Sequence, residues 1–348
     1  MKHNQLTFAR EYRGITQTEL SKMVDGLSQP NLSKFEKGIN TLSDDLLHKI
    51  MDVLSFPYEF LNVTMEHEFD RNFRKKASLK STEKGKIERF VESVAYCVDC
   101  MCEDLEVPDF RFPCIDVESG VEPEEIALQV RRMFRLGVSP ILNLCNFMER
   151  NGVMIYEWDC PYDGFDGISL NTTKGNRIVI INRNRSNDRK IYSLAHELGH
   201  TLMHNNIDFF IVSSRDKEDE ANRFASEFLM PELGIRSSLL NLRFSDLPSL
   251  KRYWRSSMSS IIVRARKLNQ INDTKYKSHM IELSRRGWRI SEPYEVDLDN
   301  PVVIDKMFSA MRNGLGYDLG TLSEYMCLPR DILQTIFLNR SKVVYMRT

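Results

Sequence analysis

The segment from residue 191 to residue 204 places two histidines and a glutamate at a spacing that suits metal chemistry. His196, Glu197 and His200 form the pattern His-Glu-x-x-His inside an otherwise apolar run. On a helix, residues four positions apart lie on one face, so the two imidazoles can bind a single metal ion. Glu197 then lies beside the ion, where it can take a proton from a coordinated water. The alternative is an ordinary buried helix with two incidental histidines.

A third ligand is expected from the next helical segment, which begins near Glu218 and stops at Pro231. A catalytic zinc site needs three protein ligands and an open position. Glu218 shares one stripe with Asn222, and two alanines on that stripe would let this helix approach the first one closely. We therefore expect Glu218 as the third ligand and Asn222 as the residue that holds a ligand imidazole by a hydrogen bond. Glu220 falls on another face, and the alternative for these acids is a solvated helix N-terminus.

Several motifs resemble the ImmA/IrrE family of metallopeptidases: the run 182–204, Arg189 seven residues before His196, and the strings Glu-x-x-Ala-Asn-x-Phe-Ala and Leu-Met-Pro that follow. The resemblance covers roughly residues 125–231. It implies a small zincin-like domain in which zinc is bound by the two histidines and Glu218, with the motif glutamate as general base. Members of this family typically cut a partner repressor at one site. Zinc and manganese both accept two histidines and a carboxylate, so zinc is inferred from the type of ligands.

A second set of motifs lies near the N-terminus. Thr16 begins a helix with Glu19 completing a capping box, and Ser28 caps the next helix, which Gly38 ends. Two helices joined by a short glycine-containing turn form a helix-turn-helix. The stretch resembles the XRE class of phage-repressor-like DNA-binding domains, whose typical strings are Thr-Gln-x-x-Leu and Ser-Gln-x-x-Ile-Ser-x-x-Glu-x-Gly.

By that resemblance, the helix from Ser28 to Lys37 enters the major groove of DNA. Amide side chains pair with adenine in two-point fashion, so Gln29 and Asn31 are expected to read base edges, with the others on phosphates or bases nearby. A single domain of this kind binds half a site, so a homodimer is expected. The alternative is a protein-interaction module. The candidate DNA-contacting residues are Gln17, Ser28, Gln29, Asn31, Ser33, Lys34 and Lys37.

The composition is that of a soluble globular protein, with 42% hydrophobic residues, 28% charged residues and a net charge of -1. No apolar run reaches the ~20 residues needed to cross a membrane, and the polar N-terminus predicts no signal peptide. Seven cysteines without a disulfide spacing fit a reducing cytoplasm, which is the expected location. Cys97 and Cys100 are expected in a core helix. The basic stretch 71–89 either extends the DNA footprint or is a solvated connector.

These elements predict a mostly helical α+β protein with one small sheet placed before the metal-binding helix. The run from Gly167 to Leu170 is expected to be an edge strand that holds a substrate backbone by strand addition. The strand-like runs are 153–156, 167–170 and 177–182. The expected domains are an all-α helix-turn-helix domain at 1–62, a helical linker at 63–122, a zincin-like metallopeptidase domain at 123–235 and a helical C-terminal region at 236–348.

The expected function is that of a DNA-binding transcriptional regulator with a zinc-dependent endopeptidase domain that cuts a repressor or antitoxin-like partner. The alternative is a transcription factor or antitoxin whose zinc site is structural or senses metal without cutting. The intact Glu197 favours the peptidase, because a structural site needs no base and is usually closed by four ligands.

Overall fold

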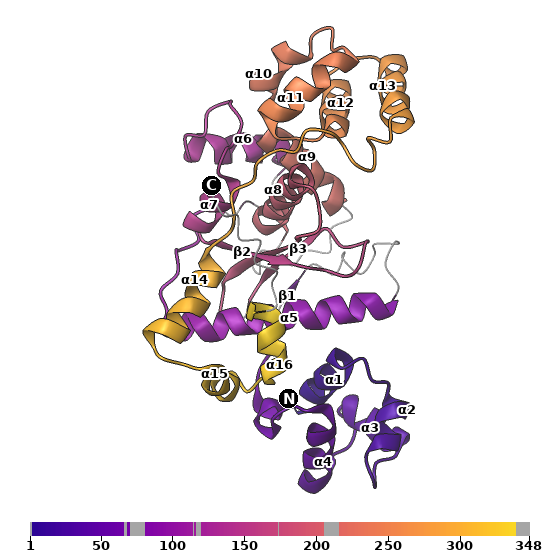
Figure 1. Ribbon diagram of the computed structural model, residues 1–348, viewed down its shortest axis with the longest axis vertical. Helices are drawn as coiled ribbons and strands as arrows, with labels where there is room; N and C mark the ends of the chain where they lie inside the picture. Colours follow the sequence, from indigo (N-terminus) through magenta and orange to yellow (C-terminus); the bar gives the residue numbers. More distant parts are fainter. Residues whose placement is uncertain are drawn as a thin grey trace, which may run out of the picture.

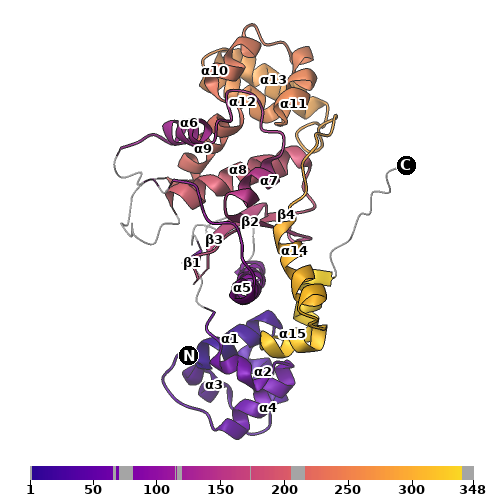
Figure 2. The same cartoon turned by 90° about the vertical axis from the view of Figure 1, so that its left-hand side faces the viewer.

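A small sheet lies in the middle of an elongated molecule, with the N-terminal helices at one end and a helical module at the other (Figures 1 and 2). The computed structural model describes residues 2–65, 68–69, 81–113, 115, 120–172, 174–204 and 216–338. The arrangement confirms the expected mostly helical α+β fold. Residues 71–80 of the predicted basic stretch lie outside the described residues.

The N-terminal domain is a set of short helices packed around one hydrophobic core. Thr16 and Glu19 exchange side-chain and backbone hydrogen bonds, so the predicted capping box is present at the start of α2. The Ser28 hydroxyl caps α3 by accepting a hydrogen bond from the backbone N–H of Asn31. The elements are α1 (Lys2–Tyr12), α2 (Gln17–Met23), α3 (Gln29–Glu36), α4 (Asp44–Leu54) and the 3-10 helix η1 (Tyr58–Asn62).

The sheet has the strand order β1-β3-β4-β2, with β2 and β4 parallel and β3 antiparallel to both of its neighbours. Within the described residues, β1 pairs only with Leu170 and Asn171 of β3. The prediction of an edge strand is therefore wrong for Leu170, which β1 covers, and among the described residues no strand pairs with residues 167–169 on that side. The strands are β1 (Glu68–Phe69), β2 (Val153–Trp158), β3 (Gly167–Asn171) and β4 (Arg177–Asn182).

Successive residues of a strand point to opposite faces, and here the two faces belong to two different hydrophobic cores. One face packs against α5 (Ser81–Asp104) and the C-terminal helices, and the other packs against α8 (Asn187–Met203). The first face carries Met154, Tyr156, Ile178 and Ile180, and the second carries Val153, Ile155, Val179 and Ile181.

Helix α5 lies under the sheet, between it and the N-terminal domain (Figures 1 and 2). Cys97 and Cys100 are buried in this helix, which confirms their predicted place in a core helix. The C-terminal helices extend from the sheet to the N-terminal domain, where Asp331 forms an ion pair with Arg13 at 2.5 Å. These helices are α14 (Val303–Ser309), α15 (Leu319–Tyr325) and α16 (Arg330–Leu333), with π-helical turns η6 (Ala310–Gly314) and η7 (Gln334–Leu338).

The opposite face of the sheet carries α8 and the helices packed around it. The buried ion pair between Arg264 and Glu227 ties the distal helices to α9 (Lys217–Leu229). Lys251 forms a second buried link, to Asp188 of α8 at 2.6 Å. The other elements are α6 (Pro123–Met133), α7 (Leu144–Arg150), α10 (Glu232–Ile235), α11 (Leu247–Trp254), α12 (Met258–Lys267) and α13 (Asp273–Arg285), with 3-10 turns η4 (Arg236–Leu239) and η5 (Phe244–Asp246).

Two carboxylates hold the chain where it returns from α13 to α14. Asp299 accepts hydrogen bonds from the N–H groups of residues 145–146 at 3.1 and 2.7 Å, at the start of α7. Glu149, at the other end of α7, accepts from the N–H groups of residues 302–303 at 2.9 and 3.0 Å. Each carboxylate satisfies helix-terminal N–H groups that have no partner within their own helix. The crossing segment is thereby fixed to α7.

We expect Glu149→Ala to loosen the attachment of α14. The substitution leaves the N–H groups of residues 302–303 without their charged acceptor, which costs about 2–4 kcal/mol of local stability. Hydrogen exchange should show faster exchange at Val302 and Val303, together with a lower thermal midpoint. Glu232→Ala, which removes an exposed ion pair with Arg236, should change neither measurement appreciably. Unchanged exchange at residues 302–303 in the Glu149 variant would contradict the expectation.

Candidate metal centre and nucleic-acid interface

Helices α8 and α9 approach each other closely at Gly199. A Cβ atom added to this glycine would lie 3.0 Å from Phe224 Cδ1 and 3.4 Å from Ala221 Cα. A glycine inside a helix costs about 1 kcal/mol relative to alanine, and the space that it leaves here is what α9 occupies. The close contact brings the first turn of α9 alongside the histidines of α8. Glu218 lies in that turn.

The ligating atoms of three predicted residues converge on one point. His196 Nε2 and His200 Nε2 lie 3.1 Å apart, and each lies 3.5 Å from an oxygen of the Glu218 carboxylate. Zinc binds imidazole nitrogen and carboxylate oxygen at about 2.1 Å, and a tetrahedral centre with such bonds separates its ligands by about 3.4 Å. The spacing of the three atoms therefore fits a small divalent cation.

Asn222 fixes the proton position of His196. Its Oδ1 atom lies 3.2 Å from His196 Nδ1 and accepts a hydrogen bond from the Tyr192 hydroxyl at 2.9 Å. Burial raises the pKa of Tyr192 to about 12, so the phenol remains a donor and Asn222 Oδ1 is the acceptor. His196 then carries its proton on Nδ1, which leaves the Nε2 lone pair directed at the cluster.

His200 is held by a second histidine and an acid that the sequence analysis did not assign. Its Nδ1 lies 2.9 Å from His204 Nδ1, and His204 Nε2 lies 2.8 Å from a Glu220 oxygen. The His204 and Glu220 side chains are only 2% and 7% exposed. With His204 donating from Nε2 to the carboxylate, its Nδ1 accepts the proton of His200, and the His200 Nε2 lone pair also faces the cluster. The i+4 spacing from His200 to His204 was the available signal.

Three acceptor atoms thus face one another in a partly buried site. The neighbouring imidazoles, His196 first and then His200, hold the pKa of the Glu218 carboxyl well below its ordinary value, so this carboxylate is charged. Facing lone pairs and a carboxylate repel one another unless a cation lies between them. Among the described residues, these three form the group of histidines and acids that could hold a metal ion.

Glu197 lies between the cluster and the sheet. Its side chain is buried, and its Cγ atom lies 3.4 Å from the position that a Cβ on Gly167 would take. Gly167 begins β3 at the half of that strand which β1 leaves uncovered within the described residues. The arrangement places a carboxylate next to the candidate metal ligands and to a part of β3 that no described strand covers on the β1 side, which is suited to hydrolysis of an extended chain.

The candidate DNA residues lie on α3 and beside it. Gln29 donates to the Gln17 side-chain oxygen at 3.0 Å, and Gln17 donates to Glu36 at 2.7 Å. Glu36 also forms a buried ion pair with Arg10 of α1 at 2.6 Å, which fixes α3 to the domain. The two glutamines are thus positioned as a pair. Asn31, Lys34 and Lys37 are exposed, Ser33 is partly buried, and Ser28 is engaged in capping α3.

The fold and the site resemble those of a helix-turn-helix protein joined to a metallopeptidase-type domain, and the family comparisons support this likeness. Residues 8–61 match the family described as helix-turn-helix, and residues 148–266 match the family described as IrrE N-terminal-like domain. The chain therefore contains one segment that matches each of the two families that its motifs resemble. Neither the curated proteins nor the solved structures contain a match to it. No helix in the described part of the chain is long and apolar enough to cross a membrane.

We expect Glu220→Gln to weaken metal binding although Glu220 is not a ligand in this arrangement. The variant removes the charge that holds His204, and with it the orientation of His200, so affinity should fall about tenfold or more. The dissociation constant is measured by competition with a chromophoric zinc chelator, and the visible spectrum of the cobalt-loaded protein reports ligand geometry. Asp219→Asn changes the exposed neighbouring acid and should leave both unchanged. Equal affinity in the two variants would exclude the positioning role.

Proposed function

We propose that this protein is a transcriptional regulator that binds DNA through its N-terminal domain and cleaves a repressor or antitoxin-like partner with a zinc-dependent endopeptidase domain. His196, His200 and Glu218 are the proposed zinc ligands, and Glu197 is the proposed general base. The convergence of three ligand atoms at 3.1 to 3.5 Å carries this proposal. Zinc is preferred over manganese because two of the three ligands are imidazoles.

The chain's own residues divide the catalytic work. His196, His200 and Glu218 would hold the zinc ion, which would supply Lewis acidity towards the attacking water and the scissile carbonyl. The Glu197 carboxylate takes a proton from the attacking water and delivers it to the amine that leaves. Asn222 and His204 keep the two imidazoles in the tautomer that ligation needs.

Residues 167–169 of β3, which no described strand covers on the β1 side, are the proposed site for the substrate backbone. Residues 167–169 border the position of Glu197, and within the described residues β1 does not pair with them. An extended segment added beside these residues would present its peptide groups to the base in a fixed register. Gly167 suits this place, because a side chain there would press on Ile180 and Glu197.

The N-terminal domain is proposed to deliver this activity to DNA. Gln29 and Asn31 would read base edges, while Gln17, Ser28, Ser33, Lys34 and Lys37 would contact phosphates or bases nearby. One such domain covers a half-site, so we propose a homodimer on a palindromic operator. The C-terminal helices contact this domain through the ion pair of Asp331 with Arg13, and Asn31, Lys34 and Lys37 of α3 are still exposed. This exposure is compatible with DNA binding by the full chain.

The rival function is a regulator with a structural or metal-sensing zinc site. Glu197 separates the two, since only a peptidase requires a base at that position. The Glu197 carboxylate is buried next to the start of β3, which would suit a base that acts on an extended substrate and favours the peptidase.

We expect Glu197→Gln to retain one metal ion per chain and to lose cleavage by about 10²–10⁴-fold or more. His196→Ala and Glu218→Ala should lose the metal as well. Metal is measured by elemental analysis, and cleavage by searching for new protein termini in cells that produce the wild-type protein or the Glu197 variant. Glu232→Gln, on an exposed carboxylate, serves as the matched control. Normal regulation and an unchanged set of termini with glutamine at position 197 would favour the rival.

We expect Asn31→Ala and Lys34→Ala to weaken DNA binding in different ways. Loss of a two-point base contact at Asn31 should cost about 1–3 kcal/mol on the operator and little on random DNA. Loss of a phosphate contact at Lys34 should weaken both and reduce the salt slope by about 1. Titrations at several salt concentrations measure these terms. An equal loss on both DNAs for the Asn31 variant would argue against base reading there.

A further inference from the structure

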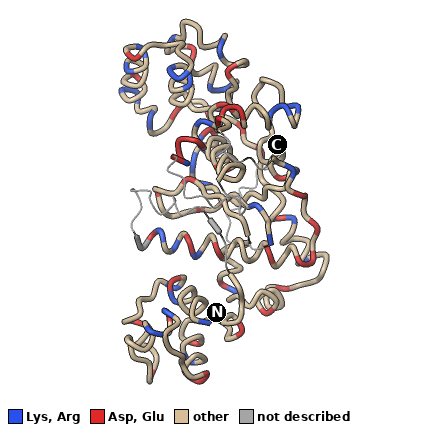
Figure 3. Tube along the Cα trace, turned by 180° about the vertical axis from the view of Figure 1, so that it is seen from behind, with Lys and Arg blue, Asp and Glu red and all other residues tan. Residues whose placement is uncertain are grey.

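The helical module at the end opposite the DNA-binding domain is strongly basic (Figures 1 and 3). Residues 243–294 contain 12 Lys and Arg against 4 Asp and Glu, whereas the whole chain has 48 against 49. Lys251 and Arg264 are buried in ion pairs, and the remaining basic residues are partly or fully exposed. The DNA-binding domain at residues 1–62 has no such excess, with 7 basic and 8 acidic residues. The module therefore carries a larger excess of positive charge than the helix-turn-helix domain itself.

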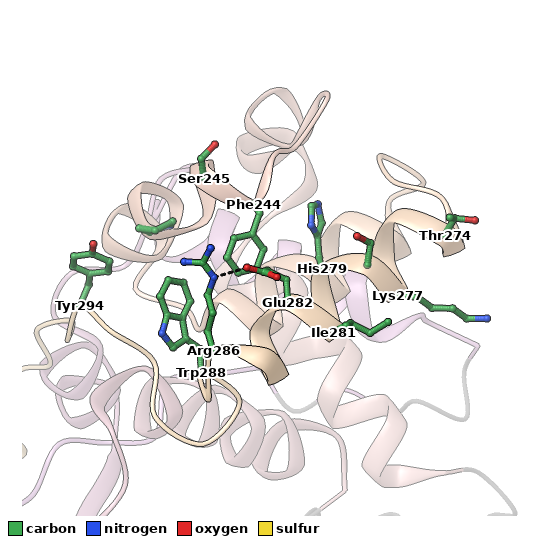
Figure 4. Close-up of a pocket in the computed structure, with 12 residues that line it drawn as sticks. Phe244, Ser245, Thr274, Lys277, His279, Ile281, Glu282, Arg286, Trp288 and Tyr294 are labelled. Carbon is green, nitrogen blue, oxygen red and sulfur yellow. Dashed lines mark hydrogen bonds and ion pairs between the residues drawn. The ribbon is translucent and has the colours of Figure 1, made fainter.

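A groove of about 1020 Å³ opens on this module between η5 and α13 (Figure 4). Phe244 and Trp288 stack in it, with ring centroids 5.7 Å apart. The Arg286 guanidinium lies 5.1 and 5.0 Å from the two ring centroids and pairs with Glu282 at 2.6 Å. The rings and the guanidinium hold one another in place, so this part of the groove is preformed.

The rim of the groove is apolar and exposed. Ile281 and Tyr294 line it and are 67% and 50% exposed. Ile290, which follows Trp288 in the same loop, is 96% exposed. Surfaces that combine Trp, Tyr and Phe with Arg are typical of the energetically important centre of protein interfaces.

His279 adds a polar group to the groove. It is 7% exposed, and its Nε2 atom has no hydrogen-bond partner among the described residues. Burial lowers the pKa of this histidine, while a hydrogen bond to the Leu242 backbone partly offsets the effect. A neutral ring that donates to the Leu242 carbonyl leaves Nε2 as an acceptor. A backbone N–H of a bound chain would satisfy it.

These properties select one kind of occupant. A nucleic-acid duplex gains from positive charge but not from a concave apolar floor, and reading its major groove requires a protruding element. In this groove the faces of Phe244 and Trp288 are stacked against each other and covered by Arg286, rather than presented singly for bases to stack on. The last ten residues of the chain, 339–348, contain three basic and no acidic residues, so their charge has the same sign as that of the module. An acidic protein segment with an apolar side chain complements both the charge and the floor.

We propose that the groove between η5 and α13 docks an acidic peptide segment of a partner protein. An aromatic or aliphatic side chain of that segment packs against Phe244 and Trp288, and its carboxylates pair with Lys277 and Arg286. His279 Nε2 accepts a hydrogen bond from its backbone. The proposal is independent of the peptidase function, because docking is measured without cleavage.

The test uses the full-length protein and fluorescein-labelled peptides of about twelve residues, in which Phe and Leu lie three positions apart between Asp and Glu residues. We expect saturable binding that weakens with salt and changes the fluorescence of Trp288. Lys277→Glu should weaken it about tenfold, which corresponds to about 1.4 kcal/mol. Lys275→Glu is the matched control, because Lys275 lies on the same helix and does not line the groove. It should keep the affinity within about twofold.

Three outcomes would overturn the proposal. Equal weakening by the Lys275 and Lys277 variants would reduce the effect to diffuse charge. Unchanged binding after Phe and Leu are replaced by Ala would remove the groove from the interaction, as would the absence of binding at about 1 mM peptide. Displacement of bound peptide by random duplex DNA, with tight DNA binding that is lost in Lys277→Glu, would assign the surface to nucleic acid instead.

Discussion

The alternation of side chains across the sheet connects the two ends of this molecule. In β2 and β4, each residue that packs against α8 is followed by one that packs against α5 and the C-terminal helices. A shift of one residue in the register of either strand would turn the side chains of each set to the opposite face of the sheet, so that neither core would keep its own residues. Helix α8, which carries the candidate metal ligands, and the helices that contact the N-terminal domain are therefore attached to opposite faces of the same few strands. The ion pair between Arg13 and Asp331 continues this connection into the DNA-binding domain.

The sequence predicted those features of the site that depend only on residue spacing within one helix. His196 and His200 are four residues apart, and the capping residues of α2 and α3 mark helix ends directly, so these features could be read without a fold. Contacts between segments far apart in the chain could not be predicted in this way. The hydrogen bond between Asp299 and Asn146 spans 153 positions, and no local pattern announces it. For the same reason, α5 and the C-terminal helices were expected as a linker and a separate region, whereas they pack together under the sheet.

The metal site itself illustrates this limit. Glu218 and Glu220 are both acidic residues in the first turn of α9, and helical geometry separates their faces. The residues that each face contacts depend on the position of α9 along α8, which the packing of Gly199 against Phe224 determines. The observed contact sets Glu218 against the two Nε2 atoms and Glu220 against His204. The four-residue spacing of His200 and His204 was visible in the sequence. The role of His204 became clear only from its contact with the Glu220 carboxylate.

The distribution of charge gives a physical reason for joining a DNA-binding domain to a peptidase-type domain. A DNA-binding domain with 7 basic and 8 acidic residues has little nonspecific affinity, so base contacts decide where it resides. A partner bound near that site is then met at the high effective concentration that tethering provides. The proposed cleavage would then need little affinity at the candidate metal site itself. Selectivity among neighbouring proteins has to come from elsewhere on the chain, and the basic aromatic groove at its far end offers the chemistry to supply it.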